Sequence, residues 1–389
     1  MALKALLLLP SPPASLTFDA VSIAYRAAIT DVVHVLKSQS TSTALTIAVN
    51  VSSLKKNQLE LPRSVIYERT QHLLAGLYSL FCAVCTKLQV DIESGLSGSV
   101  DVRMILLTSS LDKPASGGPL IDVVALATSK STWGKVFLAN DEETKSVLTS
   151  LQGSDALLPE VQYVSSASAS SADAATTEFS KEDSKDARPH QIVAVGGTFD
   201  HIHAGHKLLL TATALLLQPS SEPRRLIVGI TGDELLKNKK YAQYLGSWKQ
   251  RSDDVVHFLL SIISVRRFPM HSLEMSSRND PVPNGTAIHT RIVPLNLTIE
   301  CVEIQDPFGP TITDENVTAL VVSGETRSGG QAVNDERAKK GWAPLEVFEI
   351  DVLDSGEPED ASKTENFASK ISSTAIRKRI ADRGGKPLL

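Results

Sequence analysis

The sequence predicts an α/β protein with two α/β domains, the second built on a doubly wound parallel sheet. Short apolar runs typical of buried strands alternate with helix-forming runs over most of the chain. Residues 164–190 interrupt this alternation with a segment rich in Ser, Ala and charge. After it, the apolar run 192–195 leads through two glycines into a polar loop and a helix-forming run, 207–217. We therefore expect an N-terminal domain at 1–163, a flexible linker at 164–190 and a second domain at 191–389.

The composition is that of an ordinary globular protein. With 389 residues, 42% hydrophobic and 21% charged, the chain is long enough for two domains with apolar cores. Its formal net charge of −5 excludes a general attraction to nucleic acid or to anionic membranes. No apolar run reaches the roughly 18 residues of a membrane span, and Pro10 interrupts the apolar start too early for a signal peptide. The chain has 3 cysteines, a usage typical of a reducing compartment, so we expect a cytoplasmic protein.

The N-terminal domain shows the alternation without a catalytic constellation. Helical runs at 20–36 and 64–90 separate the strand-like runs 5–9, 45–51, 100–107 and 121–127. Its glycine pairs lie outside the spacing of a phosphate-binding loop. Cys82 and Cys85 fall in the second helical run with no second pair to complete a zinc site, so we expect buried structural cysteines. The sequence assigns no role to this domain.

Residues 164–190 are expected to be a flexible linker. They contain almost no large apolar residues, so they cannot bury enough surface to offset the entropy lost on ordering. A phosphorylated regulatory tether is the alternative interpretation.

The loop after Gly197 is the candidate binding site. It places Thr198, His203 and His206 between a strand and a helix N-terminus. The first turn of a helix presents unpaired backbone N–H groups and a partial positive charge, so an anion is expected there. His203 and His206 are three residues apart and can project from the same side of that turn, while Gly205 lets a ligand approach the backbone. The Thr198 hydroxyl can donate to a phosphate oxygen.

Three histidines in six residues also suggest a metal site. His201, His203 and His206 have nearly the spacing of the H-x-H-x-D-H loop of metallo-β-lactamase-like hydrolases. Gly205 replaces the acidic residue of that pattern, which counts against a hydrolase. A metal-dependent hydrolase stays as an alternative, and no metal ligand is assigned.

The rest of the second domain continues the alternation. Strand-like runs are expected at 226–231, 298–304 and 319–322, and helices at 250–265 and from Ile371 onward. The segment 268–294, rich in Pro, Ser and Asn, is expected to be a surface insertion. In a doubly wound sheet, ligands bind beyond the carboxyl ends of the strands, where the strand order switches. Thr198, His203 and His206 all follow such an end.

Two later segments add groups that suit a polyphosphate. Small residues at 323–324 and 329–330 predict a loop that approaches a nucleotide closely, and Arg327 within it can neutralise phosphate charge. The last helix opens with three hydroxyl residues at 372–374, and capping explains only one of them. A second helix N-terminus aimed at the same pocket would complete a polyphosphate site.

Five motifs, taken in order, resemble those of one family. GGTFDHIHAGH at 196–206 is similar to the GGTFD-x-x-H-x-G-H element of the HIGH-type nucleotidyltransferases. It is followed by LIVGITGDELLKNKK, DPFGP, VVSGETRSGGQAVNDER and ISSTAIRKR. Over residues 191–389 these motifs resemble phosphopantetheine adenylyltransferase of the eukaryotic type, as in the adenylyltransferase domain of bifunctional coenzyme A synthase. The resemblance implies a Rossmann-like nucleotidyltransferase domain.

The resemblance also implies roles for individual residues. The catalytic residues are His206, His203 and Lys237. The acceptor substrate is bound by Thr198, Phe199 and Lys237. The ATP-binding residues are Gly197, His203, Gly205, His206, Gly324, Arg327, Ser372, Ser373, Thr374 and Arg377. Relatives carry a basic residue immediately before the paired glycines, whereas this chain has Ser328 there, so the phosphate that Arg327 contacts is left open.

The implied reaction transfers AMP from ATP to 4′-phosphopantetheine and gives dephospho-CoA and pyrophosphate in coenzyme A biosynthesis. Mg²⁺ would accompany ATP, bound chiefly to its oxygens. The expected partners are ATP and 4′-phosphopantetheine, with other enzymes of the pathway, including a separate dephospho-CoA kinase, as candidates. A catalytically silent nucleotide-binding scaffold and another adenylyl or cytidylyl transferase stay as alternatives.

Overall fold

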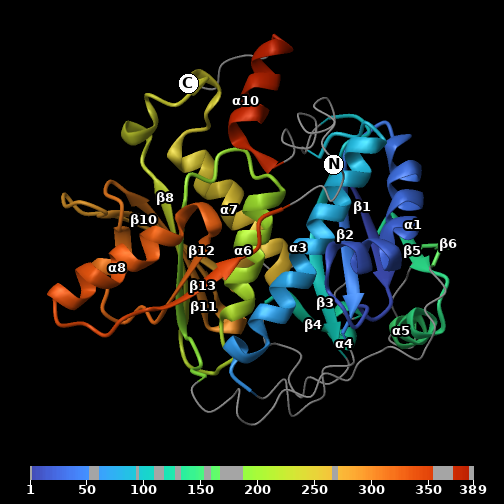
Figure 1. The fold of residues 1–389 in the computed structure, drawn as a ribbon, viewed down its shortest axis with the longest axis horizontal. Coiled ribbons are helices and arrows are strands. Elements are labelled where there is room, and N and C mark those ends of the chain that lie inside the picture. The colour runs from blue at the N-terminus through green and yellow to red at the C-terminus, as the bar shows by residue number, and fades with distance from the viewer. Residues whose placement is uncertain are drawn as a thin grey trace. The chain divides into compact units, whose positions relative to one another are not determined.

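The chain folds into two compact units, each with a sheet of its own (Figure 1). The computed structural model describes residues 2–51, 61–92, 96–108, 118–127, 133–152, 159–166, 187–264, 270–353 and 371–384. The first unit consists mainly of residues 1–187, and the second mainly of residues 188–260, 268–352 and 371–389. A separate α/β domain therefore precedes the second domain, as the sequence predicts.

The first unit is a parallel sheet with helices between its strands. Among the described residues its strands lie in the order β4-β3-β2-β1-β5-β6, and every neighbouring pair is parallel. The elements are β1 Leu3–Leu9, α1 Phe18–Lys37, β2 Thr43–Asn50, α3 Arg63–Lys87, β3 Val100–Thr108, β4 Leu120–Asp122, α4 Val123–Ala127, β5 Lys135–Ala139, α5 Glu142–Gln152 and β6 Val161–Val164. Cys82 and Cys85 are buried in α3, which confirms the prediction for both.

One strand prediction in this unit is wrong. The apolar run 121–127 is a strand only as far as Asp122, whose carboxylate accepts a hydrogen bond from the Val124 N–H (2.7 Å) where α4 begins. A carboxylate that binds a backbone N–H two residues later favours a turn over an extended chain. β5, α5 and β6 follow without having been predicted, and β6 includes Val164, the first residue of the expected linker. Residues 167–186 of that linker lie outside the described residues.

The second unit is a sheet that is parallel except for a hairpin at one edge. Its strands lie in the order β13-β12-β7-β8-β11-β10-β9. The strands and α-helices are β7 Ile192–Gly197, α6 Ala204–Leu216, β8 Arg224–Thr231, α7 Trp248–Ile263, β9 Leu273–Asn279, β10 Thr286–Ile292, β11 Leu297–Ile304, β12 Ala319–Ser323, α8 Arg327–Lys339, β13 Glu346–Ile350 and α10 Ser373–Asp382. The short 3-10 turns are η1 Asp233–Leu236, η2 Ala242–Tyr244, η3 Met270–Ser272, η4 Val293–Leu295, η5 Gly309–Ile312 and η6 Gly324–Thr326. The strand order reverses between β7 and β12, where a ligand is expected.

Helices cover both faces of this second sheet. On one face, Val333 of α8 packs with Ala194 and Val302. Cys301, the neighbour of Val302 on β11, points to the other face, because successive side chains of a strand alternate. There its sulfur lies 4.0 Å from the Ser252 carbonyl of α7. The predicted fold class, a doubly wound parallel sheet, is confirmed.

The segment expected to be a surface insertion, 268–294, contains a β-hairpin. β9 and β10 pair in antiparallel fashion, and β10 pairs with β11. Along β10, Ala287 and Ile292 are buried, whereas β9 is exposed over nearly its whole length. The segment therefore extends the sheet at its edge, and its polar composition reflects the exposed outer strand.

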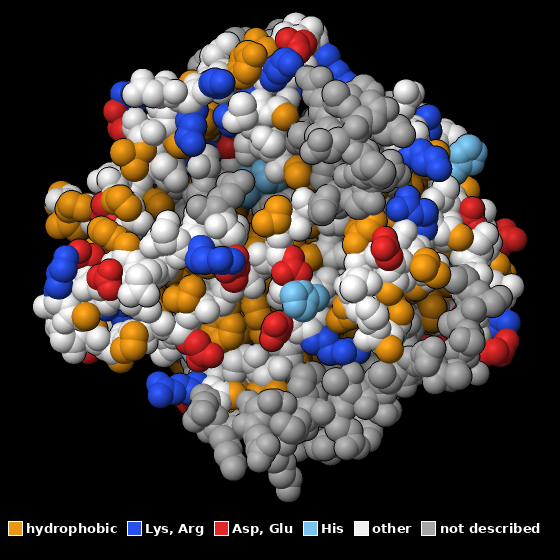
Figure 2. Space-filling view, viewed as in Figure 1, with side chains coloured by type: hydrophobic (Ala, Val, Ile, Leu, Met, Phe, Trp, Pro, Cys, Tyr) orange, Lys and Arg blue, Asp and Glu red, His pale blue; other side chains and the backbone are white. Residues whose placement is uncertain are grey.

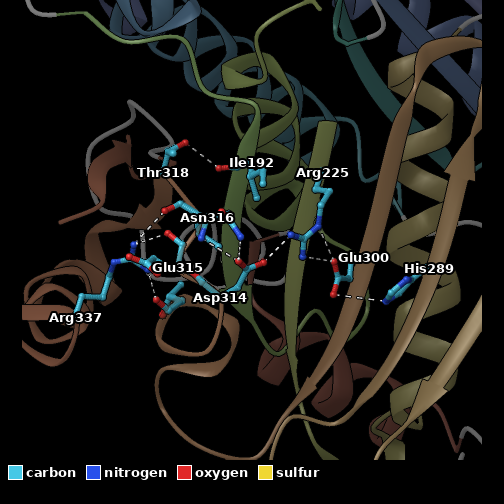
Figure 3. Close-up of polar contacts among 11 residues, drawn as sticks. Ile192, Arg225, His289, Glu300, Asp314, Glu315, Asn316, Thr318 and Arg337 are labelled. Carbon is cyan, nitrogen blue, oxygen red and sulfur yellow. Dashed lines mark hydrogen bonds and ion pairs between the residues drawn. The ribbon is translucent and has the colours of Figure 1, made fainter. Parts of the chain in front are cut away.

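Two arginines hold the loop between β11 and β12 (Figure 3). Arg337, buried on α8, donates to the carbonyl oxygens of Thr311, Asp314, Glu315, Val317 and Ala343. Arg225 of β8 donates to the carboxylates of Asp314 (2.6 Å) and Glu300 (2.7 Å). A guanidinium carries five N–H donors in one plane, so a single arginine can fix several oxygens of a loop.

The described surface carries charges of both signs. On the face drawn in Figure 2, acidic and basic side chains are interspersed among the coloured residues. Within the described part of the chain, no helix is both long enough and apolar enough to cross a bilayer.

Substitution of Gly309, in the turn after β11, tests how closely the atoms around this turn are packed. Its φ is +55°, and a Cβ there would lie 2.5 Å from Cγ2 of Ile304. We expect Gly309→Ala to lower the free energy of unfolding by about 2–4 kcal/mol, because strain at positive φ adds to overpacking. Gly341→Ala is the matched control, since its φ is +74° but no described atom lies within 4 Å. The control should lose only about 1–2 kcal/mol. Urea unfolding measures both variants, and equal losses would contradict the close contact.

Candidate active site

The loop that follows β7 turns sharply before α6 begins. Phe199 and His201 have φ values of +51° and +46°, which residues with a side chain rarely adopt. Phe199 is completely buried, and so is Asp200 between them. α6 then begins at Ala204. This compact loop is strained, so contacts from the rest of the unit must hold its conformation.

His203 and His206 lie side by side at the start of α6. His203 is the N-cap residue, and its Nδ1 accepts a hydrogen bond from the His206 backbone N–H (3.4 Å). The two imidazoles stack with ring centroids 3.8 Å apart, and the Phe199 ring centroid lies 5.2 Å from that of His206. A Cβ at Gly205 would lie 3.2 Å from Cε1 of His203, so a larger residue at this position would crowd the His203 ring. The structure thus brings together the two imidazoles that the sequence spaces three residues apart.

Both imidazoles are uncharged near neutral pH. Burial lowers the pKa of His203 well below its usual range, and the neighbouring His206 lowers it further. Burial also lowers the pKa of His206, to about 3, although a hydrogen bond with the His201 backbone partly opposes this shift. The His206 Nδ1 atom is buried and has no hydrogen-bond partner in the described structure. The residue as a whole is only half-buried, so His206 is a candidate for contact with a ligand through the rest of its ring.

The three histidines of the loop do not converge on one point. His201 donates from Nε2 to the Tyr244 carbonyl (2.8 Å), and the His203 Nδ1 already accepts the His206 N–H. No group of three His, Cys, Asp or Glu side chains among the described residues could hold a metal ion. The arrangement therefore lends no support to a hydrolase that uses this histidine cluster.

The N-terminus of α10 meets the same loop. Ser373 Oγ donates to the Asp200 carbonyl (2.8 Å), and the Ile371 carbonyl oxygen lies 3.8 Å from where a Cβ of Gly205 would be. Ser372 is the N-cap residue of α10, but its side chain makes no capping hydrogen bond. Two helix N-termini, those of α6 and α10, are therefore neighbours. An anion bound between them would be stabilised by both helix dipoles.

A buried ion pair ties α10 to the loop. Arg377 donates to one oxygen of the Asp200 carboxylate, and the other oxygen accepts the Gly246 backbone N–H (3.2 Å). The same guanidinium donates to the Lys240 carbonyl (3.1 Å) and to Thr374 Oγ1 (3.2 Å). Both charged side chains are almost completely buried. The structure therefore places Arg377 and Thr374, which the sequence predicts as ATP-binding residues, in hydrogen bonds within the protein.

Lys237 and Arg327 are exposed and pair with acidic neighbours. Lys237, directly after η1, contacts Glu234 Oε2 at 2.5 Å. Arg327, the first residue of α8, donates to both oxygens of Glu349 at 2.6 Å each. Exposed ion pairs contribute little to stability, so a phosphate can take the place of either carboxylate at small cost.

The paired glycines predicted to form a nucleotide-binding loop lie in a helix. Gly324 opens η6, but Gly329 and Gly330 belong to the start of α8. A Cβ at Gly330 would lie 2.9 Å from Cγ1 of Val347 on β13. This glycine therefore allows α8 to pack closely on β13, and the loop prediction for the pair is wrong.

Arg251 of α7 belongs to the site although no sequence motif indicates it. Its buried guanidinium donates to the Thr198 carbonyl and to the Asp233 carboxylate, next to the loop and to η1. The helical periodicity of the sequence nevertheless indicates that Arg251 is buried, because it lies one turn before the buried Val255 on the same face of α7. A charged side chain on such a face requires polar partners in the interior.

Comparison with known proteins finds a different family match in each half of the chain. Residues 194–379 match a family described as cytidylyltransferase-like, and residues 1–166 match a domain of unknown function (DUF8446). An uncharacterized protein of Schizosaccharomyces pombe is 38% identical over 200 residues, which are 51% of this chain and 51% of that protein.

Two phosphopantetheine adenylyltransferases are similar over the same half. The one from Saccharomyces cerevisiae is 35% identical over 199 residues, 51% of this chain and 52% of its own length. The one from Pyrococcus abyssi is 30% identical over 196 residues, 50% of this chain and 94% of its own length. The match thus spans about half the length of the fungal relatives and nearly all of the archaeal one.

The low pKa values of His203 and His206 predict how stability depends on pH. Both rings stay uncharged in the folded protein, whereas in the unfolded chain each takes up a proton below its ordinary pKa of 6.5. The contribution of each uncharged histidine to the free energy of unfolding is therefore fully present above this pH. As the pH falls below it, the free energy of unfolding decreases by about 1.4 kcal/mol per pH unit for each histidine. His206→Gln should remove one of these contributions. Urea unfolding of both proteins at about pH 7.5 and about pH 5.5 measures the slope, and an unchanged slope would contradict the low pKa of His206.

Proposed function

The chain belongs to the phosphopantetheine adenylyltransferase family, and on that premise we propose that it transfers AMP from ATP to 4′-phosphopantetheine. The products are dephospho-CoA and pyrophosphate. One observation carries the proposal most directly: two uncharged, stacked imidazoles lie where the N-termini of α6 and α10 meet. Such a place suits an anion with several phosphoryl groups.

The reaction needs placement more than acid or base catalysis. An oxygen of the phosphopantetheine phosphate attacks the α-phosphorus of ATP, and the bond from that phosphorus to the bridging oxygen of pyrophosphate breaks. The attacking phosphate is already ionised near neutral pH, so no side chain has to remove a proton. The protein must align the two phosphates and stabilise the negative charge on the phosphoryl oxygens.

His206 and His203 are the groups that we assign to the nucleotide phosphates. Because both rings are uncharged, a ring nitrogen that carries hydrogen can donate to a phosphoryl oxygen while the other nitrogen accepts. The place of His206 in the first turn of α6 and its stacking on His203 support this assignment. Donors held in advance of the reaction stabilise developing charge without a cost of reorganisation.

The acceptor phosphate is assigned to Lys237 and Thr198. Thr198 follows the carboxyl end of β7, and Lys237 follows the end of β8 through η1, so both lie at the same edge of the sheet. Lys237 would exchange the exposed carboxylate of Glu234 for the phosphate. Arg327 and the hydroxyl groups of Ser372 and Thr374 are the proposed contacts of the pyrophosphate that leaves. The hydroxyl hydrogen of Ser373 is already donated to the Asp200 carbonyl.

Arg377 is assigned a different role from a direct phosphate contact. Its buried guanidinium already binds the carboxylate of Asp200, the carbonyl of Lys240 and the hydroxyl of Thr374. We infer that it positions the N-terminus of α10 beside the loop.

The divalent ion that accompanies ATP, which we propose to be Mg²⁺, finds no unpaired carboxylate at the two aspartates of the loop and η1. Asp200 is bound to Arg377, and Asp233 is bound to Arg251. These residues do not fit a protein-held ion, so its ligands would be phosphate oxygens and water.

His206→Ala tests the proposed role of the imidazole pair. Loss of a preorganised donor to the transition state should lower kcat by roughly a hundredfold, about 3 kcal/mol. The measurement is pyrophosphate release from ATP and 4′-phosphopantetheine. His257→Ala, at an exposed position of α7, is the matched control and should keep the wild-type rate.

Two outcomes would contradict the proposed function. Binding of ATP without any turnover in the wild type would favour a nucleotide-binding scaffold. Faster turnover with cytidine triphosphate or with nicotinamide mononucleotide as the acceptor would indicate another nucleotidyltransferase.

Lys237→Ala separates the acceptor site from the nucleotide site. The variant should raise KM for 4′-phosphopantetheine by about tenfold, because a charge-assisted hydrogen bond to phosphate is lost. The Kd for ATP, measured by calorimetry, should stay within about threefold of the wild-type value. A larger effect on ATP than on phosphopantetheine would contradict the assignment.

A further inference from the structure

The buried side chain of Arg251 donates hydrogen bonds to three backbone carbonyls and one carboxylate around the site. Its Nη1 donates to the Thr198 carbonyl (2.6 Å), and its Nη2 donates to the Thr231 carbonyl and to the Asp233 carboxylate (2.7 Å each). Its Nε donates to the Gly246 carbonyl (2.9 Å). The residue is only 1% exposed, so a substrate does not reach the guanidinium itself.

The contact with Thr198 bears on the strained part of the loop. Thr198 directly precedes Phe199, whose φ is +51°. The Thr198 carbonyl and the Phe199 N–H belong to one peptide plane, so a short hydrogen bond to this carbonyl fixes the orientation of that plane. Removing it would let the loop relax toward a less strained conformation and would shift the Thr198 side chain.

The contact with Asp233 acts on the other half of the acceptor site. Asp233 opens η1, and Lys237 follows the end of that turn. One carboxylate oxygen of Asp233 accepts from Arg251, and the other accepts the Trp248 backbone N–H (3.0 Å). η1 is therefore anchored at its first residue to the N-terminal turn of α7.

The nucleotide half of the site has its own anchor. Arg377 and Ser373 bind Asp200 through its carboxylate and its carbonyl, and so hold α10 next to the start of α6. Gly246 contacts both anchors, since its N–H donates to Asp200 and its carbonyl accepts from Arg251. Apart from it, the two anchors share no partner among the described residues.

We propose that Arg251 is the positioning residue of the acceptor half of the site. It holds Thr198, and the turn η1 that precedes Lys237, in the positions where both side chains contact the phosphate of the acceptor. The inference rests on the proposed function. Arg377 has the corresponding task in the nucleotide half. Loss of Arg251 should therefore weaken binding of the acceptor, and loss of Arg377 should weaken binding of ATP.

Arg251→Lys and Arg377→Lys form a matched pair for the test. Each keeps the positive charge, but an ammonium group cannot reach acceptors that a planar guanidinium contacts in several directions. For both variants and the wild type, KM for each substrate and kcat are measured, with Kd for ATP and for 4′-phosphopantetheine from calorimetry. Thermal unfolding of each variant checks that it is folded.

A double dissociation is the expected result. Arg251→Lys should raise KM and Kd for 4′-phosphopantetheine by about tenfold or more and change Kd for ATP by less than about threefold. Arg377→Lys should show the reverse pattern. A merely structural role would weaken both ligands alike, so equal changes in the two Kd values for Arg251→Lys would overturn the proposal, as would a larger change for ATP.

Asp233→Asn keeps the test decisive if Arg251→Lys does not fold. It preserves the size of the side chain, removes the charge that Arg251 binds and changes a residue that is partly exposed. It should raise Kd for 4′-phosphopantetheine in the same direction and leave Kd for ATP unchanged, and the opposite pattern would overturn the proposal. Turnover by the wild type decides the proposed function separately, because the two Kd values can be compared even without turnover.

Discussion

The strained loop between β7 and α6 is the constraint on which the site depends. Two residues with side chains, Phe199 and His201, take up left-handed backbone conformations in it, at a cost of about 1–2 kcal/mol each. Such a loop persists only when its surroundings favour it over every relaxed alternative. Burial of Phe199, the hydrogen bond from Arg251 and the ion pair from Arg377 supply that preference. The positions of the imidazoles and of the two helix N-termini follow from it.

The electrostatics of the site are suited to an anion that arrives with its own cation. Inside the site, Arg377 is neutralised by Asp200 and Arg251 by Asp233, and both imidazoles are uncharged. The N-termini of α6 and α10 add a positive potential that does not depend on a titrating side chain. In the proposed reaction, ATP arrives with a divalent ion and therefore carries less negative charge than free ATP.

In the first unit, the residues at the point where the strand order reverses are arranged differently. Its strand order reverses between β1 and β5, the place where doubly wound sheets bind ligands. Near it, Ser11 donates to the Glu143 carboxylate from its N–H (2.9 Å) and its hydroxyl (2.5 Å), and the Asn50 amide donates to the same carboxylate (2.5 Å). The described residues there satisfy one another, whereas in the second unit His206 keeps an unpartnered nitrogen.

The sequence by itself determined strands β7, β8, β11 and β12 and the loop between β7 and α6, because apolar periodicity and a glycine turn are local signals. It also determined the pairing of His203 with His206, since residues three apart meet on a helical turn whatever surrounds them. It did not predict the hairpin β9–β10 or strand β13. Only the tertiary structure decided that Arg377 binds Asp200, that Arg251 binds Thr198 and that Gly330 packs on Val347 within a helix. These contacts join segments far apart in the chain. A sequence motif identifies a residue but does not show which distant residue will be its hydrogen-bond partner in the fold.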